Sequence, residues 1–244
     1  MLDFGLNCHW GKNITVPENN KNFCLIIFAR EPEEGKVKTR LLDELSVSVV
    51  TKLYRNFAED VLMLAKKVHC QKRMVYYTSS NLNLPFLSKF KNDFTLRKQK
   101  GKDLGERMYA AFKESQRQGF EHIVIIGTDC LTLTVGDIEN AFQKLQSHDC
   151  VLGPCPDGGY YLIGLNDPIQ DLFLNIPWST PDVLSLTLDR IKLLKKKVFF
   201  LEEREDIDTI EDLKRVGQYF EKQGFKNYTA LALESIKKNS SFLV

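Results

Sequence analysis

The chain alternates short apolar runs with longer segments in which apolar residues recur at helical spacing. Cys24–Ala29 (CLIIFA) is continuously apolar, which is typical of a strand that is covered on both faces. His122–Gly127 (HIVIIG) has the same character and is the strongest candidate for a central strand. Further strands are expected at 74–77, 94–98, 150–153, 160–164 and 198–201.

The segments between these runs favour amphipathic helices. Val47–Val68 carries apolar residues every three or four positions. Asp103 stands where an N-cap belongs and Gly119 where that helix would end. Further helices are expected after Thr134, over 181–194 and over 210–223, with a short helical turn at 85–90. The alternation predicts an α/β fold with a mostly parallel sheet and helices on both faces.

Composition and termini restrict the possible partners. Net charge is only +2 over 244 residues, so neither a nucleic-acid scaffold nor a membrane binder is expected, and any basic site must be local. Residues 1–22 have no signal-peptide pattern and are expected to form a polar arm before a single domain at 23–244. Six cysteines without a Cys-x-x-Cys pair are typical of free thiols in the cytoplasm. The oligomeric state stays open.

The loop after the first strand is the most basic candidate site. Gly35 would let the backbone approach a ligand, and Lys36, Lys38 and Arg40 place three cations within five residues, which suits a polyphosphate. The loop is not a Walker A motif, which needs Ser or Thr where Val37 follows the lysine. A solvated charged loop is the alternative explanation.

Carboxylates follow two other strands. Asp129 comes directly after the strongest strand, where a carboxylate can hold Mg²⁺, although it could equally cap the next turn. Asp206 and Asp208 come after the last strand and could bind a metal ion, although Asp208 could instead N-cap the helix that follows.

A glycine-rich turn lies between two further strands. Asp157-Gly158-Gly159 could bring the backbone close to a sugar or base, although a simple hairpin turn is the alternative. In parallel sheets, ligands bind in the loops at the carboxyl ends of the strands. We therefore expect all four loops to meet at one edge of the sheet.

Six motifs occur in order over roughly residues 23–215: FAREPEEGKVKTRL, QKGKDLGERM, IIGTDCLTL, GPCPDGGYYLIGL, IPWST and DIDTIEDL. Together they resemble a bacterial family of unknown function described as predicted glycosyltransferases associated with radical-SAM and selenodomain proteins. The resemblance implies the nucleotide-diphospho-sugar transferase superfamily and its Rossmann-like GT-A fold, a three-layer α/β sandwich. The Lys-Thr-Arg-Leu loop is also similar to that of 2-phospho-lactate guanylyltransferase.

The same resemblance implies roles for individual residues. Lys38, Arg40 and Asp129 would be catalytic, and Asp129 and Asp208 would bind Mg²⁺ or Mn²⁺. Nucleotide contacts are implied for Gly35, Lys36, Thr39, Asp103, Arg107, Asp157, Gly158 and Gly159. The chain departs from the family pattern at Leu131, where proline is usual, and at Lys102, which separates Gly101 from Asp103.

The favoured function is nucleotidyl transfer from a nucleoside triphosphate to a phosphorylated small molecule. Glycosyl transfer from a nucleotide sugar is the alternative, because the same metal ion could hold a diphosphate leaving group. A nucleotide-binding module without catalysis is the second alternative. The base and the acceptor are not indicated by the sequence.

Overall fold

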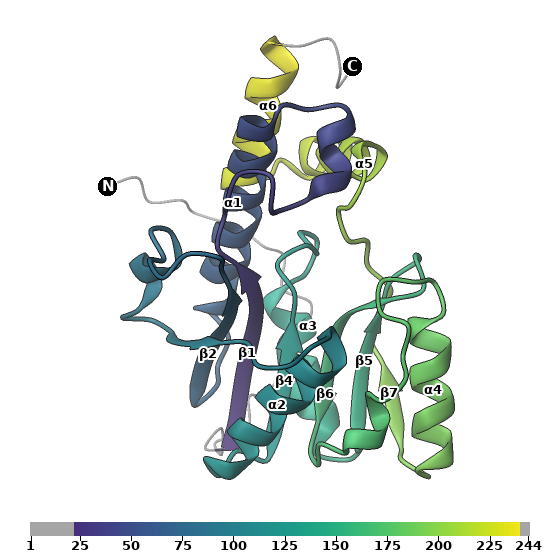
Figure 1. Ribbon diagram of the computed structural model, residues 1–244. Coiled ribbons are helices and arrows are strands. Elements are labelled where there is room, and N and C mark those ends of the chain that lie inside the picture. The colour runs from purple at the N-terminus through teal and green to yellow at the C-terminus, as the bar shows by residue number, and fades with distance from the viewer. Residues whose placement is uncertain (1–21, 240–244) are drawn as a thin grey trace.

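A seven-stranded sheet runs through the centre of the molecule (Figure 1). The computed structural model describes residues 22–239. The strands are β1 (Phe23–Arg30), β2 (Lys72–Thr78), β3 (Thr95–Lys98), β4 (His122–Ile126), β5 (Cys150–Pro154), β6 (Tyr160–Leu165) and β7 (Val198–Phe200). Their order across the sheet is β3-β2-β1-β4-β6-β5-β7. Strand β6 is antiparallel to both of its neighbours, and the other pairs are parallel.

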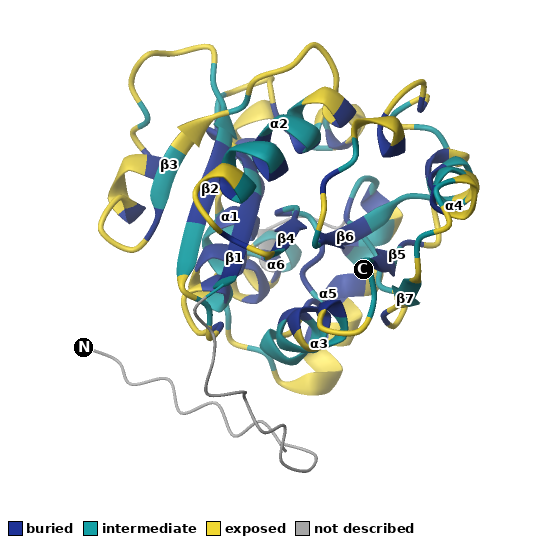
Figure 2. Cartoon of the chain, turned by 90° about the horizontal axis from the view of Figure 1, so that it is seen from below, coloured by how far each residue is buried: buried dark blue, intermediate teal, exposed yellow. Residues whose placement is uncertain are grey.

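Helices cover both faces of this sheet (Figure 2). The α-helices are α1 (Val47–Ala65), α2 (Leu104–Arg117), α3 (Val135–Leu145), α4 (Val183–Leu193), α5 (Ile210–Gln223) and α6 (Tyr228–Asn239). Short 3₁₀ helices are η2 (Thr39–Asp43), η3 (Leu87–Phe90) and η4 (Gln170–Leu172). Within residues 22–239, no helix combines the length and apolar character that crossing a membrane would need.

Strand β1 shows why two helical layers form. Its side chains alternate between the two faces, so Leu25 and Ile27 pack in one core with residues of α1, α3, α5 and α6. Cys24 and Ile26 pack in a second core with residues of α2 and α4. Because both faces are covered, the strand is apolar from Phe23 to Ala29, and only Arg30 at its exposed end is charged. The predicted three-layer α/β sandwich is confirmed.

The strand directions bring the four candidate loops to one edge. Strands β1, β4 and β5 are parallel to one another, since β6 runs against both β4 and β5. Strand β7 is parallel to β5, so its following segment leaves from the same edge. The β5–β6 turn starts there as well. The predicted convergence of the loops therefore agrees with the topology.

The predicted elements differ from the observed ones mainly at their ends. All seven strands are present, and the helix expected at 210–223 has those bounds. The helix expected over 47–68 ends at Ala65, and the one expected from Pro181 begins after an N-cap at Asp182. Three of the described elements were missed: η2 inside the basic loop, η4 after β6, and α6 at the end of the described residues. The predicted arm lies, except for Asn22, outside the described residues.

Helix α5 has a complete capping box that can be tested by mutation. The Thr209 hydroxyl oxygen accepts from the Asp212 N–H at 3.3 Å, and the Asp212 carboxylate accepts from the Thr209 N–H at 2.7 Å. Thr209→Ala should lower the free energy of unfolding by about 1 kcal/mol, as N-cap deletions usually do. Urea denaturation checks this. Thr209→Ser should keep most of the stability, and equal losses in both variants would contradict the capping role.

Candidate functional site

Three predicted site residues from distant parts of the chain meet at the carboxyl edge of the sheet. The Nζ atom of Lys38 lies 2.9 Å from Oδ2 of Asp129 and 2.7 Å from Oδ1 of Asp208. Lys38 is the last residue before η2, Asp129 follows β4, and Asp208 precedes α5. The Lys38 side chain is 7% exposed, whereas those of Asp129 and Asp208 are 37% and 43% exposed. One ammonium therefore joins two carboxylates that a ligand can still reach.

Lys38 is a permanent cation in this arrangement. Burial alone would lower the pKa of its ammonium, but the Asp129 and Asp208 carboxylates outweigh burial and hold that pKa above its ordinary value. Its backbone is left-handed, with φ 44° and ψ 49°, which is uncommon for a residue with a side chain. The Leu41 N–H donates to the Lys38 carbonyl at 3.0 Å, so η2 fixes this backbone position.

The rest of the basic loop faces solvent. Nη1 of Arg40 lies 3.3 Å from Oδ2 of Asp208, and the Arg40 side chain is 62% exposed. Lys36 and Thr39 are exposed as well. Gly35 adopts a positive φ of 69° beside open space. These residues are placed where a ligand can approach, and their nucleotide contacts stay predictions.

Two glutamates fasten the first loop to the segment after β2. The Glu31 carboxylate is buried and accepts from the N–H groups of Phe86 and Leu87 at 2.7 and 3.1 Å. The Glu33 carboxylate accepts from the N–H of Ser80 at 3.0 Å. Sequence reasoning missed both, because a glutamate in a polar loop gives no signal of its partner. The loop is held in place rather than solvated along its whole length.

Tyr54 on α1 connects the ends of the two central strands and was also missed. Its hydroxyl oxygen accepts from the Arg30 N–H at 2.8 Å and lies 3.2 Å from Oγ1 of Thr128. Burial, and then the Asp129 carboxylate, raise the pKa of Tyr54 to about 12, so the phenol stays neutral. The Ile207 N–H donates to the Asp129 carbonyl at 3.2 Å. The backbones carrying the two predicted metal ligands are thus joined directly.

Asp206 is a third carboxylate beside this group. Its Oδ1 atom is buried and has no hydrogen-bond partner among the described residues. Burial and the Asp129 carboxylate raise the pKa of Asp206 to about 7. The sequence indicated Asp206 only as the companion of Asp208.

Arg204 ties the last loop to the loop after β4. Its Nη1 donates to the Thr132 carbonyl and its Nη2 to Oδ1 of Asp137, both at 2.9 Å. Its position in a charged stretch gave no signal of this role. The contacts fix the segment before Asp208 against the segment after Asp129.

The Asp157-Gly158-Gly159 turn has the tight geometry expected of it. Oδ1 of Asp157 accepts from the Gly159 N–H at 2.9 Å. Gly158 has φ 85°, and a Cβ atom there would lie 2.0 Å from the Pro181 carbonyl oxygen. This glycine is therefore required because the turn packs closely against Pro181, in the segment before α4. A nucleotide contact of this turn stays a prediction.

Asp103 and Arg107 stabilise the start of α2. The Asp103 carboxylate accepts from the Glu106 N–H at 2.8 Å, which confirms the predicted N-cap. Nε of Arg107 donates to the Gly101 carbonyl at 3.1 Å. These contacts are local, and neither residue is in the ion-pair group around Lys38. Their predicted place beside the nucleotide remains untested.

The donor set at Asp129 and Asp208 fits a magnesium ion. Both carboxylates already converge on one cation, the Lys38 ammonium, which stands in for an ion at that position. Among the residues from 22 to 239, no three or more His, Cys, Asp or Glu side chains are grouped to hold a metal by themselves. Mg²⁺ does not need such a cage, since it is commonly held by one or two carboxylates together with water and substrate phosphates.

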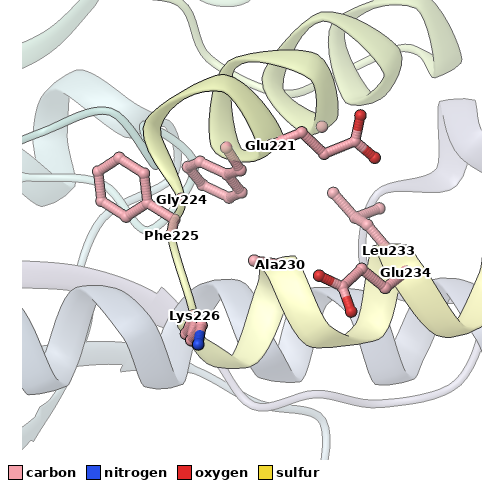
Figure 3. A pocket seen from close by; sticks show the side chains of 9 residues that line it. Glu221, Gly224, Phe225, Lys226, Ala230, Leu233 and Glu234 are labelled. Carbon is pink, nitrogen blue, oxygen red and sulfur yellow. The ribbon is translucent and has the colours of Figure 1, made fainter.

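A separate cavity lies between α5 and α6 (Figure 3). Its volume is about 210 Å³, and it is lined by the aromatic rings of Phe220 and Phe225 together with Leu233 and the carboxylates of Glu221 and Glu234. None of the predicted site residues lines it. The chemistry expected from the sequence therefore belongs to the strand edge and not to this cavity.

Comparisons with known proteins agree with the fold and the motifs. The family described as "Uncharacterized protein conserved in bacteria (DUF2064)" matches residues 61–180. A crystal structure from Desulfovibrio desulfuricans G20, described provisionally as a nucleotide-diphospho-sugar transferase, is 31% identical with a TM-score of 0.83. The match covers 89% of this chain and 96% of that one. No match was found among curated protein sequences.

More distant structures share the fold alone. CMP:2-keto-3-deoxy-manno-octonic acid synthetase, solved with CTP, is 10% identical with a TM-score of 0.54, over 84% of this chain and 100% of that one. 4-Diphosphocytidyl-2C-methyl-D-erythritol synthase from Anaerococcus prevotii is 11% identical with a TM-score of 0.57, over 86% of this chain and 100% of that one.

Proposed function

This chain belongs to the bacterial DUF2064 family, with the fold of the nucleotide-diphospho-sugar transferases, and we propose that it transfers a nucleotidyl group from a nucleoside triphosphate to a phosphorylated small molecule. It is a transferase. The observation that carries the proposal is the group formed by Lys38, Asp129, Asp208 and Arg40. Two carboxylates and two cations at one strand edge match what a metal-bound polyphosphate requires.

The reaction breaks one bond and forms one at the α-phosphorus. An oxygen of the acceptor phosphate attacks that phosphorus, and the bond to the β-phosphate oxygen breaks, so pyrophosphate leaves with the electron pair. Such chemistry needs little covalent participation from the protein, because positioning and charge stabilisation dominate. Mg²⁺ or Mn²⁺, when bound, would neutralise phosphate oxygens.

The chain's own residues divide this work. Asp129 and Asp208 would hold the metal ion. The Arg40 side chain is 62% exposed, and with Lys36 it would contact the phosphates and stabilise charge on the departing pyrophosphate. Lys38 would join them once a nucleotide is bound. The acceptor would enter beside the segment after β2 that Glu31 and Glu33 hold in place.

Glycosyl transfer from a nucleotide sugar is the second candidate. It is favoured by the provisional description of the Desulfovibrio desulfuricans structure, which is 31% identical. The same carboxylates and cations would then hold a nucleoside diphosphate as the leaving group. The products separate the two reactions, since only nucleotidyl transfer releases pyrophosphate.

Ligand binding and product analysis test the proposal together. Nucleoside triphosphates and nucleotide sugars are screened by thermal shift with and without Mg²⁺. A ligand at about 100 times its Kd should add about 2.7 kcal/mol of stability. We expect the largest Mg²⁺-dependent shift from a triphosphate, and pyrophosphate release once phosphorylated acceptors are added.

Each other outcome has a defined meaning. Release of a nucleoside diphosphate from a nucleotide sugar would replace nucleotidyl by glycosyl transfer. Binding that ignores Mg²⁺, without turnover of any donor, would indicate a nucleotide-binding module. The absence of any shift would overturn the nucleotide proposal itself.

A further inference from the structure

Lys38 occupies the position to which a metal ion would bind. Its ammonium lies 2.9 Å from Asp129 and 2.7 Å from Asp208, so it contacts one oxygen of each predicted ligand. An ion bridging the same two carboxylates would have to lie near Nζ, because Mg²⁺–oxygen distances are only about 2.0–2.1 Å. The sequence suggested that Lys38 contacts phosphate. In the structure it contacts the carboxylates instead.

The two cations cannot share this space. Both would need the same carboxylate oxygens, and at such short range like charges repel strongly in a partly buried environment. The Lys38 side chain is 7% exposed, so little water is available to screen the repulsion. Entry of a metal ion therefore requires the ammonium to leave.

Moving the Lys38 ammonium away from both carboxylates without a new anionic partner would cost free energy. A buried cation that loses two carboxylates is left uncompensated, which typically destabilises a protein strongly. Nucleotide phosphates would remove that cost, because they offer the ammonium new anionic oxygens. The Lys38 backbone is fixed by η2, so the exchange needs only rotation about side-chain bonds.

We propose that Lys38 is a built-in competitor of the metal ion, so that the ion binds between Asp129 and Asp208 only together with a nucleotide that draws the ammonium away. This inference rests on the metal site of the proposed function. It makes Lys38 the residue that couples metal binding to nucleotide binding. Because the two binding equilibria are linked, the nucleotide strengthens metal binding and the metal ion strengthens nucleotide binding by one common factor.

The test uses Mn²⁺ alone, followed by electron paramagnetic resonance of the free ion with the full-length protein. Wild-type protein should bind Mn²⁺ weakly without nucleotide. Lys38→Met should bind it more tightly by about tenfold or more, within the usual range of coupling between sites. Arg40→Met is the matched control, because it removes an exposed cation that contacts only Asp208. It should change Mn²⁺ affinity much less.

A double variant, Lys38→Met with Asp129→Asn, should lose the gain, which places the ion at this site. If Lys38→Met does not fold, Lys38→Gln replaces it, because glutamine also removes the positive charge. Unchanged or weaker Mn²⁺ binding in the folded Lys38 variant would overturn the proposal. That result would leave nucleotidyl transfer standing, whereas a gain in Mn²⁺ binding without pyrophosphate release would reject the proposed reaction alone.

Discussion

Asp129→Asn should lower turnover by about 10²- to 10³-fold, the range found when one preorganised charge-stabilising group is removed from an active site. The asparagine has the same shape but carries no negative charge, so it would hold a divalent ion poorly. Asp129 is anchored through its backbone, whose carbonyl accepts from the Ile207 N–H at 3.2 Å, and the substitution leaves this bond in place. Asp208 would still pair with the Lys38 ammonium at 2.7 Å, so this cation keeps one carboxylate and most of the loss should come from the site.

The measurement is pyrophosphate release at saturating nucleotide, with thermal melting as a control for folding. Asp171→Asn, at an exposed position in η4, is the matched substitution and should leave turnover unchanged. If Asp129→Asn kept turnover within about threefold of wild type, the decrease would be far smaller than expected for a charge-stabilising group. That result would remove Asp129 from the proposed metal site.

Gly158→Ala should lower the free energy of unfolding by about 2–5 kcal/mol. Two costs add here. A side chain at φ 85° costs about 1–2 kcal/mol of backbone strain. The new Cβ would also lie 2.0 Å from the Pro181 carbonyl oxygen, and overpacking of this kind costs about 1–3 kcal/mol.

Gly119→Ala separates the two costs. Gly119 has a similar φ of 91°, but a Cβ there would meet nothing within 4 Å. Its variant should show the backbone strain alone, so the difference between the two variants measures the packing of the turn against the segment before α4. Urea denaturation of both gives the values. Equal losses would show that the contact with Pro181 relaxes freely.

The sheet could be predicted because its strands are buried on both faces. Continuous apolar runs such as those of β1 and β4 leave few other interpretations. Helix α5 was predicted to the residue, and Gly224 marks its end as expected, but its N-cap is Thr209 and not Asp208, the residue considered for that role. Helix α6 was missed because its apolar residues are not confined to one narrow stripe. Its start depends on Asp60 of α1, whose carboxylate accepts from two N–H groups at the first turn.

The site could be predicted only as a set of loops. The directions of the strands explain why Lys38, Asp129 and Asp208 lie at one edge of the sheet. Their direct contact depends on side-chain directions across 170 residues of chain, for which a sequence gives no measure. Tyr54 is a similar case. Its helical spacing marks it as a core residue, but the sequence does not indicate that its hydroxyl hydrogen-bonds to Arg30 and Thr128 at the ends of β1 and β4.

The pairing of α6 with α1 also bears on how the chain folds during synthesis (Figure 1). Helix α1 ends at Ala65, whereas Ala230 and Leu233, which pack in the same core, are synthesised at least 165 residues later (230 − 65 = 165). At ribosomal rates of about 5–20 residues per second, that face of α1 waits on the order of ten seconds for its cover. During this interval the apolar face of α1 that α6 covers in the folded structure lacks that cover.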